Sequence, residues 1–208
     1  CIMAFWNAPL DIEDQERKAT ECVLEMREGL GELNERLKEE GLDEINTGAG
    51  INTGLCVVGN FGSSSRFDYS VLGDAVNLAA RLEGANKFYK TYSMISGSTY
   101  ELTKDDVDSR QLDIIRVVGK KEPVPVHELL ARKNETSSEM SGVVEQYMKG
   151  LKLYQDKNFT DAVKEFEKVL TIDPEDGPSQ TYVKRCGVFI ETPPEKDWDG
   201  VFTFTEKG

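Results

Sequence analysis

Two polar side chains, Asn77 and Arg81, have types and a spacing suited to holding phosphate. They lie four residues apart in Asp74–Phe88, where apolar residues recur at helical spacing, so both share one helix face. An arginine offers a planar fork of donors to phosphate oxygens and can neutralise charge that develops in a transition state. The spacing also suits a surface ion pair between Arg81 and Glu83 or another acid, and spacing alone favours that structural alternative.

The composition excludes several classes of protein. The chain of 208 residues carries 25 basic and 38 acidic residues, a net charge of −13. That balance argues against a nucleic-acid binder and against a polybasic membrane-surface protein. Residues 51–121 hold 8 acids and 9 bases, so an anionic substrate is expected to meet this segment.

The sequence shows neither a membrane span nor a signal peptide. No apolar run approaches the roughly 20 residues that a transmembrane helix needs. The first ten residues lack a basic start, although the chain begins at a cysteine followed by an apolar run. We expect this region to lie in the cytoplasm, with a membrane anchor upstream left open.

Cysteine and histidine usage limits the metal and redox chemistry. The four cysteines show no Cys-x-x-Cys spacing and are expected to remain reduced: Cys1, Cys22, Cys56 and Cys186. The single histidine, His127, argues against a histidine-based metal site or a Ser-His-Asp triad. It lies in a predicted strand, where we expect it to be exposed.

The spacing of apolar residues predicts alternating strands and helices up to Ala131, which indicates an α/β or α+β domain. A long helix is predicted for Asp11–Glu40, and a β-hairpin is predicted within 48–62 around an Asn-Thr-Gly turn, followed by a loop through Ser65. The other predicted elements are helices at Asp74–Phe88 and Ser98–Thr103 and strands at Ser93–Ser96, Leu112–Val118 and Val124–Leu130.

The C-terminal part has a different pattern. Residues 132–141 are polar and serine-rich, which predicts a linker, and helices are predicted at about 142–155, 160–172 and 178–189. One group of residues falls close to the tetratricopeptide-repeat pattern: Gly150, Leu153, Tyr154, Ala162, Phe166, Val169 and Pro174. A single repeat buries its faces poorly, so we expect it to pack on the helix near Tyr182, on the first domain or on a protein partner. An ordinary helical hairpin is the alternative. Trp198 is expected to anchor the tail in an apolar groove.

Four ordered segments resemble the catalytic domain of class III nucleotide cyclases, the adenylate and guanylate cyclase family. They are Met3–Pro9, Gly50–Gly54, Asp68–Asn77 continued by Ala80–Glu83, and Val118–Lys120 followed by Glu122–Val124. The resemblance implies an α+β, ferredoxin-like domain that forms a head-to-tail homodimer with active sites at the dimer interface. The predicted organisation is a cyclase domain at 1–131, truncated at its N-terminus, a linker at 132–141, a helical region at 142–190 and a tail at 191–208.

The resemblance also implies a reaction and the residues that perform it. ATP would be converted to cyclic AMP and pyrophosphate as the ribose 3′-oxygen attacks the α-phosphate. Asn77 would orient the ribose, Arg81 would stabilise the transition state, and Lys120 would hold the terminal phosphates. Ser70 falls at the base-selecting position, where a hydroxyl does not by itself choose between ATP and GTP.

This chain departs from the family pattern at the metal ligands. Two Mg²⁺ or Mn²⁺ ions would be held by two aspartates whose positions are expected upstream of Cys1, and Asp11 and Asp14 do not replace them. We therefore expect an inactive second half of a cyclase domain, within an intracellular signalling enzyme. A guanylate cyclase, a degenerate cyclase-like scaffold and a nucleotide-binding module without turnover are the alternatives.

Overall fold

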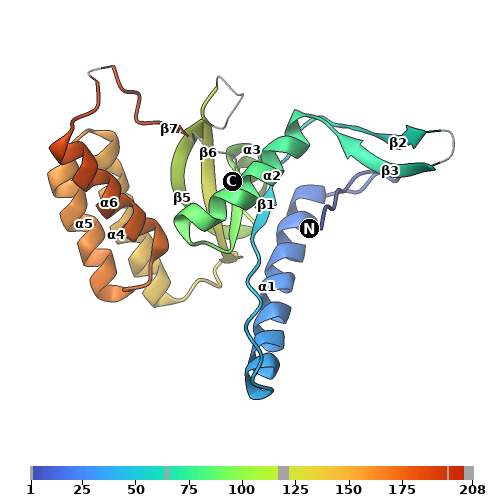
Figure 1. Ribbon diagram of the computed structural model, residues 1–208, viewed down its shortest axis with the longest axis horizontal. Helices are drawn as coiled ribbons and strands as arrows, with labels where there is room; N and C mark the ends of the chain where they lie inside the picture. The colour runs from blue at the N-terminus through green and yellow to red at the C-terminus, as the bar shows by residue number, and fades with distance from the viewer. Residues whose placement is uncertain (1, 64–65, 117–121, 196, 204–208) are drawn as a thin grey trace.

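The computed structural model describes residues 2–63, 66–116, 122–195 and 197–203 (Figure 1). The helices are α1 (Gln15–Glu39), α2 (Asp74–Tyr89), α3 (Gly97–Thr103), α4 (Ser138–Gln155), α5 (Phe159–Ile172) and α6 (Gly177–Glu191). The strands are β1 (Ala49–Ile51), β2 (Val57–Ser63), β3 (Arg66–Leu72), β4 (Ser93–Ser96), β5 (Val107–Arg116), β6 (Val124–Arg132) and β7 (Phe202–Thr203).

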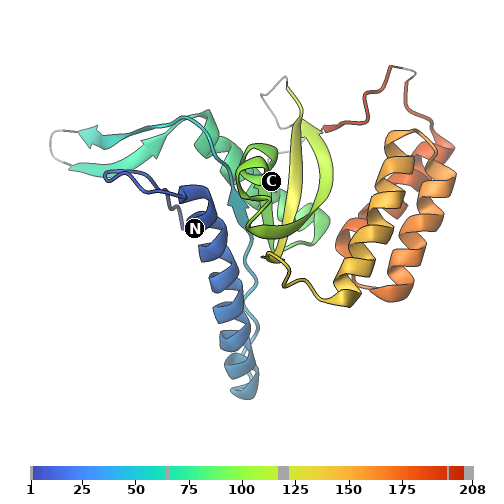
Figure 2. The same ribbon diagram turned by 180° about the vertical axis from the view of Figure 1, so that it is seen from behind.

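The central sheet has the strand order β1-β4-β6-β5-β7. β1 runs parallel to β4, β6 is antiparallel to both β4 and β5, and β7 runs parallel to the end of β5. The fold is therefore mixed α+β, as the sequence predicts. β2 and β3 form a separate antiparallel pair that extends away from the sheet (Figures 1 and 2).

Helices cover both faces of the sheet, and β4 shows how the two cores divide. All four of its residues are buried; Met94 belongs to a core with α2, α4, α5 and α6, whereas Ile95 belongs to a core with α1. Consecutive strand residues point to opposite faces, so this alternation is expected of a strand covered on both sides. α2 and the helical region thus share one face.

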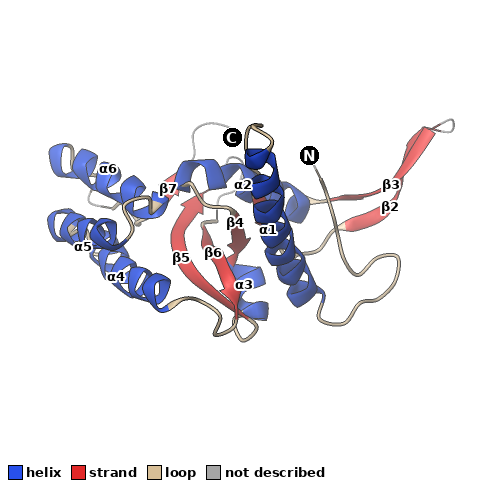
Figure 3. Cartoon of the chain, turned by 90° about the horizontal axis from the view of Figure 1, so that it is seen from below, coloured by secondary structure: helices blue, strands red, loops and turns tan. Residues whose placement is uncertain are grey.

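The helical region α4–α6 lies beside the β5 side of the sheet (Figure 3). Each helix begins with a side chain that accepts a hydrogen bond from its first turn: Ser137, Asn158 and Asp176. Phe166 of α5 packs against Gly150 of α4, where an added Cβ would lie 2.8 Å from the ring. Glycine at 150 thus allows α4 and α5 to cross closely, while the tetratricopeptide assignment itself stays a prediction.

The core is continuous between the helical region and the sheet. Tyr147, Tyr182 and Cys186 are fully buried in the same cluster as Leu82 and Leu112. Trp198 of the tail packs on the aromatic rings of the helical region, as predicted: Tyr154, Phe159 and Phe189. Of the three expected packing partners, the structure shows two, the helix that carries Tyr182 and the first domain, and it does not test a protein partner.

The predicted hairpin within 48–62 is wrong. Its first strand, β1, pairs with β4, and its second, β2, pairs with β3. Both strands have the local signal of a hairpin arm, but their partners lie further along the chain. The predicted loop through Ser65 is correspondingly shorter, because β2 continues to Ser63 and β3 begins at Arg66.

Two other local expectations are corrected. His127 lies in β6 but is buried, with 8% of its surface exposed, because the ring of Tyr100 stacks on it at 4.0 Å. Burial lowers the pKa of His127 to about 4, so the ring is neutral near pH 7. α4 begins at Ser138, within the segment predicted as a linker, and β6 still includes Arg132.

Three of the four cysteines lie within the described residues and have the reduced state that the sequence predicts. Cys22, Cys56 and Cys186 are free thiols, and Cys1 lies outside the described residues. Among the helices that the structure describes, none combines the length and the apolar character needed to cross a bilayer.

Candidate functional site

Asn77 and Arg81 lie on the first half of α2, as predicted, and share one side of the helix. Asn77 is exposed and Arg81 is half-buried. The half-buried Arg81 keeps its donors accessible to a ligand, while the surrounding protein limits the directions in which its side chain can extend. The pair can therefore present an amide and a guanidinium to one ligand.

The charge of Arg81 is unpaired among the residues that the structure describes. In the part of the chain that the structure describes, its guanidinium has no ion-pair or hydrogen-bond partner. Glu83, the acid proposed as an alternative partner, has its carboxylate 3.3 Å from the position of a Cβ added at Gly48, beside β1. The ion-pair alternative is therefore wrong for Glu83, and the guanidinium remains available for an anion.

The backbone of β1 positions α2 by direct contact. A Cβ added at Gly50 would lie 2.2 Å from the Ala79 carbonyl oxygen and 2.3 Å from the Glu83 amide nitrogen. No side chain can fit there, so glycine allows the strand to lie against the helix backbone at Ala79 and Glu83, on either side of Arg81 in the sequence. The site helix is fixed relative to the sheet at the turn that carries the proposed phosphate ligands.

Two asparagines fix α2 at its ends. Asn52, just after β1, donates from Nδ2 to the Ala75 carbonyl at 3.0 Å. Asn86 donates from Nδ2 to the Ala49 carbonyl at 2.8 Å and is almost fully buried. Asn86 cannot be recognised from the sequence, since one amide late in a helix has no distinctive spacing.

Of the other two predicted site residues, the structure describes Ser70, which precedes the N-terminal end of α2. Ser70 lies on β3, opposite Gly59, and only Val71–Gly73 separate it from the start of the helix. Lys120 lies outside the described residues. The segment that follows it, Pro123 to Pro125, lines a pocket of about 400 Å³ together with residues of α2 and of the loop after β1: Asp74, Ala75, Leu78, Asn52, Thr53 and Leu55.

The described residues do not fit a metal site. They contain no group of three or more His, Cys, Asp or Glu side chains that could hold a metal ion. Asp11 and Asp14 precede α1 and belong to no such group among the described residues.

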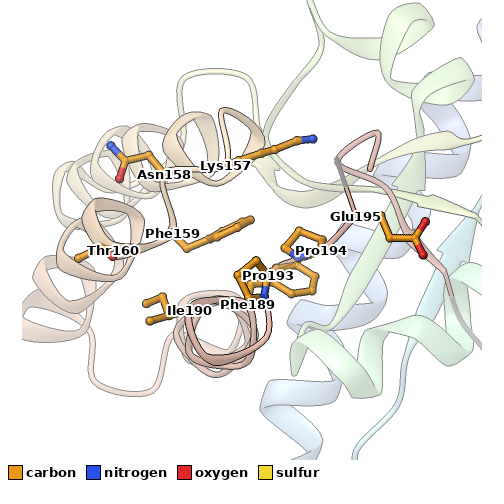
Figure 4. A pocket seen from close by; sticks show the side chains of 9 residues that line it. All are labelled: Lys157, Asn158, Phe159, Thr160, Phe189, Ile190, Pro193, Pro194 and Glu195. Atoms are coloured by element: carbon orange, nitrogen blue, oxygen red, sulfur yellow. The ribbon is translucent and has the colours of Figure 1, made fainter. Parts of the chain in front are cut away.

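A second cavity, of about 500 Å³, lies in the helical region at the start of α5 and the end of α6 (Figure 4). Phe159, Phe189, Pro193 and Pro194 form much of its wall. None of the predicted site residues lines it, so it is separate from the site on α2.

The fold and the side chains on α2 together define a class: a mixed α+β domain that presents an amide and an unpaired guanidinium from one helix beside a pocket. Residues 2–131 match the family described as the adenylate and guanylate cyclase catalytic domain. This match covers more than half of the chain, and the chain belongs to that family.

Curated relatives include adenylate cyclases from a bacterium and an amoeba. Adenylate cyclase 1 of Rhizobium meliloti is 36% identical over 129 residues, which are 62% of this chain and 19% of the relative. The terminal-differentiation-specific adenylate cyclase of Dictyostelium discoideum is 33% identical over 152 residues, 71% of this chain and 7% of the relative. The chain thus spans a fifth or less of the length of these two relatives.

Solved cyclase structures share the fold. The adenylyl cyclase CyaB from P. aeruginosa has a TM-score of 0.55 and 31% identity, covering 62% of this chain and 67% of that one. The guanylyl cyclase Cya2 has a TM-score of 0.54 and 34% identity, covering 64% of this chain and 66% of that one. These neighbours support the α+β cyclase domain but do not test the helical region.

Proposed function

We propose that this chain supplies the transition-state half of an adenylate cyclase active site. In the reaction, a bond forms between the ribose 3′-oxygen and the α-phosphorus of ATP. The bond from that phosphorus to the bridging oxygen of the β-phosphate breaks, the 3′-hydroxyl loses its proton, and pyrophosphate leaves. The products are cyclic AMP and pyrophosphate.

Arg81 is proposed to stabilise the charge that builds on the α-phosphate, and Asn77 to orient the ribose. Lys120 would hold the terminal phosphates, and Ser70 would contact the purine edge. The observation that carries the proposal is the Arg81 guanidinium: it is half-buried, four residues after Asn77, and unpaired among the described residues. A charged donor held in place before the reaction costs no reorganisation when the transition state forms.

The family's divalent metal ions do not fit the described residues, which contain no metal-binding group. We assign them no step through these side chains. We propose that residues 1–208 alone form no cyclic nucleotide with Mn²⁺ and that the natural full-length protein is active.

We further propose that the active form is a homodimer joined through the cyclase domain. The β2–β3 pair projects from the sheet and exposes apolar side chains: Val57 (67%), Phe67 (64%), Tyr69 (48%) and Leu72 (54%). Apolar patches of this kind commonly mark protein–protein contacts. Sedimentation of the chain with and without Phe67→Ser would test this, because the variant should shift the population toward monomer.

The main test is the cyclase activity of the natural full-length protein with ATP and with GTP. Arg81→Ala should lower kcat by about 100-fold or more, the loss expected when one transition-state donor is removed. Lys87→Ala is the matched control, since Lys87 is an exposed base on the same helix, and it should stay within twofold of wild type. If Arg81→Ala keeps more than a third of the activity, the proposed role is wrong. Faster turnover of GTP would instead assign a guanylate cyclase.

A further inference from the structure

A bulge in β5 attaches the helical region to the sheet. Gln111 pairs with His127 and Asp113 pairs with Val126, so Leu112 is left without a partner in β6. The free carbonyl of Leu112 accepts hydrogen bonds from two tyrosine hydroxyls of the helical region, Tyr147 at 2.8 Å and Tyr182 at 2.9 Å.

The next residue, Asp113, joins the sheet, α2 and α6 through one carboxylate. Its Oδ2 accepts from the Tyr89 hydroxyl at 2.6 Å and from Nη1 of Arg185 at 2.6 Å. The side chains of Asp113 and Arg185 are 2% and 6% exposed. Burial, with the nearby Asp113 charge, raises the pKa of Tyr89, so its hydroxyl remains a donor. Tyr89 is the last residue of α2, the helix that carries Asn77 and Arg81.

The start of α6 lies directly against the end of α2. A Cβ added at Gly177 would lie 2.2 Å from the Tyr89 carbonyl oxygen and 2.5 Å from Cβ of Lys90. Thr181 donates from its hydroxyl to the Phe88 carbonyl at 3.1 Å. The last carbonyls of a helix have no partner within it, so α6 provides one from outside.

The tail adds a second connection between α6, β5 and α2. Phe202 in β7 lies opposite Ile115 near the end of β5, and its ring lies 3.9 Å from the Arg185 guanidinium. The same ring stacks on Phe88 of α2 at 5.1 Å. Phe202 therefore contacts α2 through its ring and pairs with β5 through its backbone.

We propose that α6 positions the nucleotide site, with Gly177 and Arg185 as positioning residues that act through Tyr89 and Asp113. Tyr89 lies eight positions after Arg81, about 12 Å along a continuous helix, so a shift at the end of α2 moves the guanidinium. Displacements of about 1 Å at a reacting centre can cost about 100-fold in rate. Separating the helical region from α2 would thus reduce turnover without any contact with the nucleotide. This inference rests on the proposed function for the role of Arg81.

The first test measures hydrogen exchange in the chain of residues 1–208. Gly177→Ala should force α6 away from α2 and speed amide exchange in the last turn of α2 by about tenfold or more, with α1 unchanged. Gly187→Ala is the control, because it adds the same methyl group to α6 where nothing lies within 4 Å. If Gly177→Ala does not fold, Thr181→Val removes only the hydroxyl that reaches Phe88 and should speed exchange there about fivefold. Unchanged exchange in α2 in the variant that folds would refute the coupling.

The second test measures the kinetics of the natural full-length protein. Gly177→Ala, or Thr181→Val if the first does not fold, should lower kcat about tenfold and leave KM within twofold. The nucleotide contacts remain in this variant, but their alignment is lost. Gly187→Ala should match wild type. Wild-type kcat in a variant whose α2 exchanges faster would overturn the inference but leave the proposed function intact. Full activity of Arg81→Ala would overturn the proposed function, whatever the α6 variants do.

Discussion

Replacing Asp113 with alanine is expected to destabilise the chain more than the loss of an ordinary surface ion pair. Asp113 pairs with Arg185 at 2.6 Å, and both side chains are almost completely buried. It also accepts the hydrogen bond of the Tyr89 hydroxyl at 2.6 Å. Alanine would leave a buried guanidinium without its counter-charge and a buried hydroxyl without an acceptor.

The magnitude follows from that burial. Removing one partner of a buried ion pair costs about 3–5 kcal/mol, because the remaining charge keeps its desolvation penalty. For a chain of this size that loss lowers the midpoint of thermal unfolding by roughly 6–20 °C. The Phe202 and Tyr182 rings, 3.9 and 4.8 Å from the guanidinium, cannot replace a carboxylate.

Urea unfolding, followed by circular dichroism and by tryptophan fluorescence, measures the loss. Glu145→Ala is the control: it breaks an exposed pair with Lys149 and should leave the unfolding curve unchanged. The double variant Asp113→Ala with Arg185→Met should recover much of the loss, since it no longer buries an unpaired charge. A loss below about 1 kcal/mol in the single variant, or a double variant less stable than Asp113→Ala, would refute the reasoning.

Three further predictions concern single residues. Gly50→Ala should destabilise the chain in urea far more than Gly59→Ala, because only the first adds a methyl group against the α2 backbone; equal effects would contradict the close contact. The folded-state pKa of His127, about 4, lies below its ordinary value of 6.5. The stability that the neutral ring contributes is therefore complete above pH 6.5 and falls as the pH drops toward 4. The free energy of unfolding should decrease by up to about 3 kcal/mol over this range. His127→Gln should remove that part of the pH dependence, and an unchanged slope of stability against pH would exclude it. Iodoacetamide should label the exposed Cys56 quickly and the buried Cys186 only on unfolding, since burial raises the pKa of the Cys186 thiol to about 12. Peptide mass spectrometry measures both labelling rates, and equal rates in the folded protein would contradict the prediction.

Much of the local structure could be predicted from the sequence. β4 has its predicted limits, and α2 differs by one residue, because periodicity and turn signals depend only on neighbouring residues. The hairpin prediction failed because a strand does not encode its partner locally: β1 and β2 lie close in sequence but pair with different strands. His127 was misjudged for a related reason, since the ring that covers it comes from α3.

The candidate site, too, could be predicted from the sequence only in part. The helical period places Asn77 and Arg81 on one side of α2, so the sequence alone determined that they can act on one ligand. Whether Arg81 is free for that ligand depends on where the surrounding acids point, and the structure directs Glu83 toward β1. The contacts of Gly50 and Asn86 were equally unpredictable, because each joins segments that only the sheet brings together.

The sequence by itself determined the family, the order of the elements and the residue types that could handle phosphate, because short-range spacing and motif order carry that information. Only the tertiary structure decided how the helical region relates to the site. The hydrogen bonds to Leu112 and the close approach of Gly177 to Tyr89 join residues 35 to 88 positions apart in the chain. Contacts of that kind arise when distant segments share one core, and no local pattern encodes them.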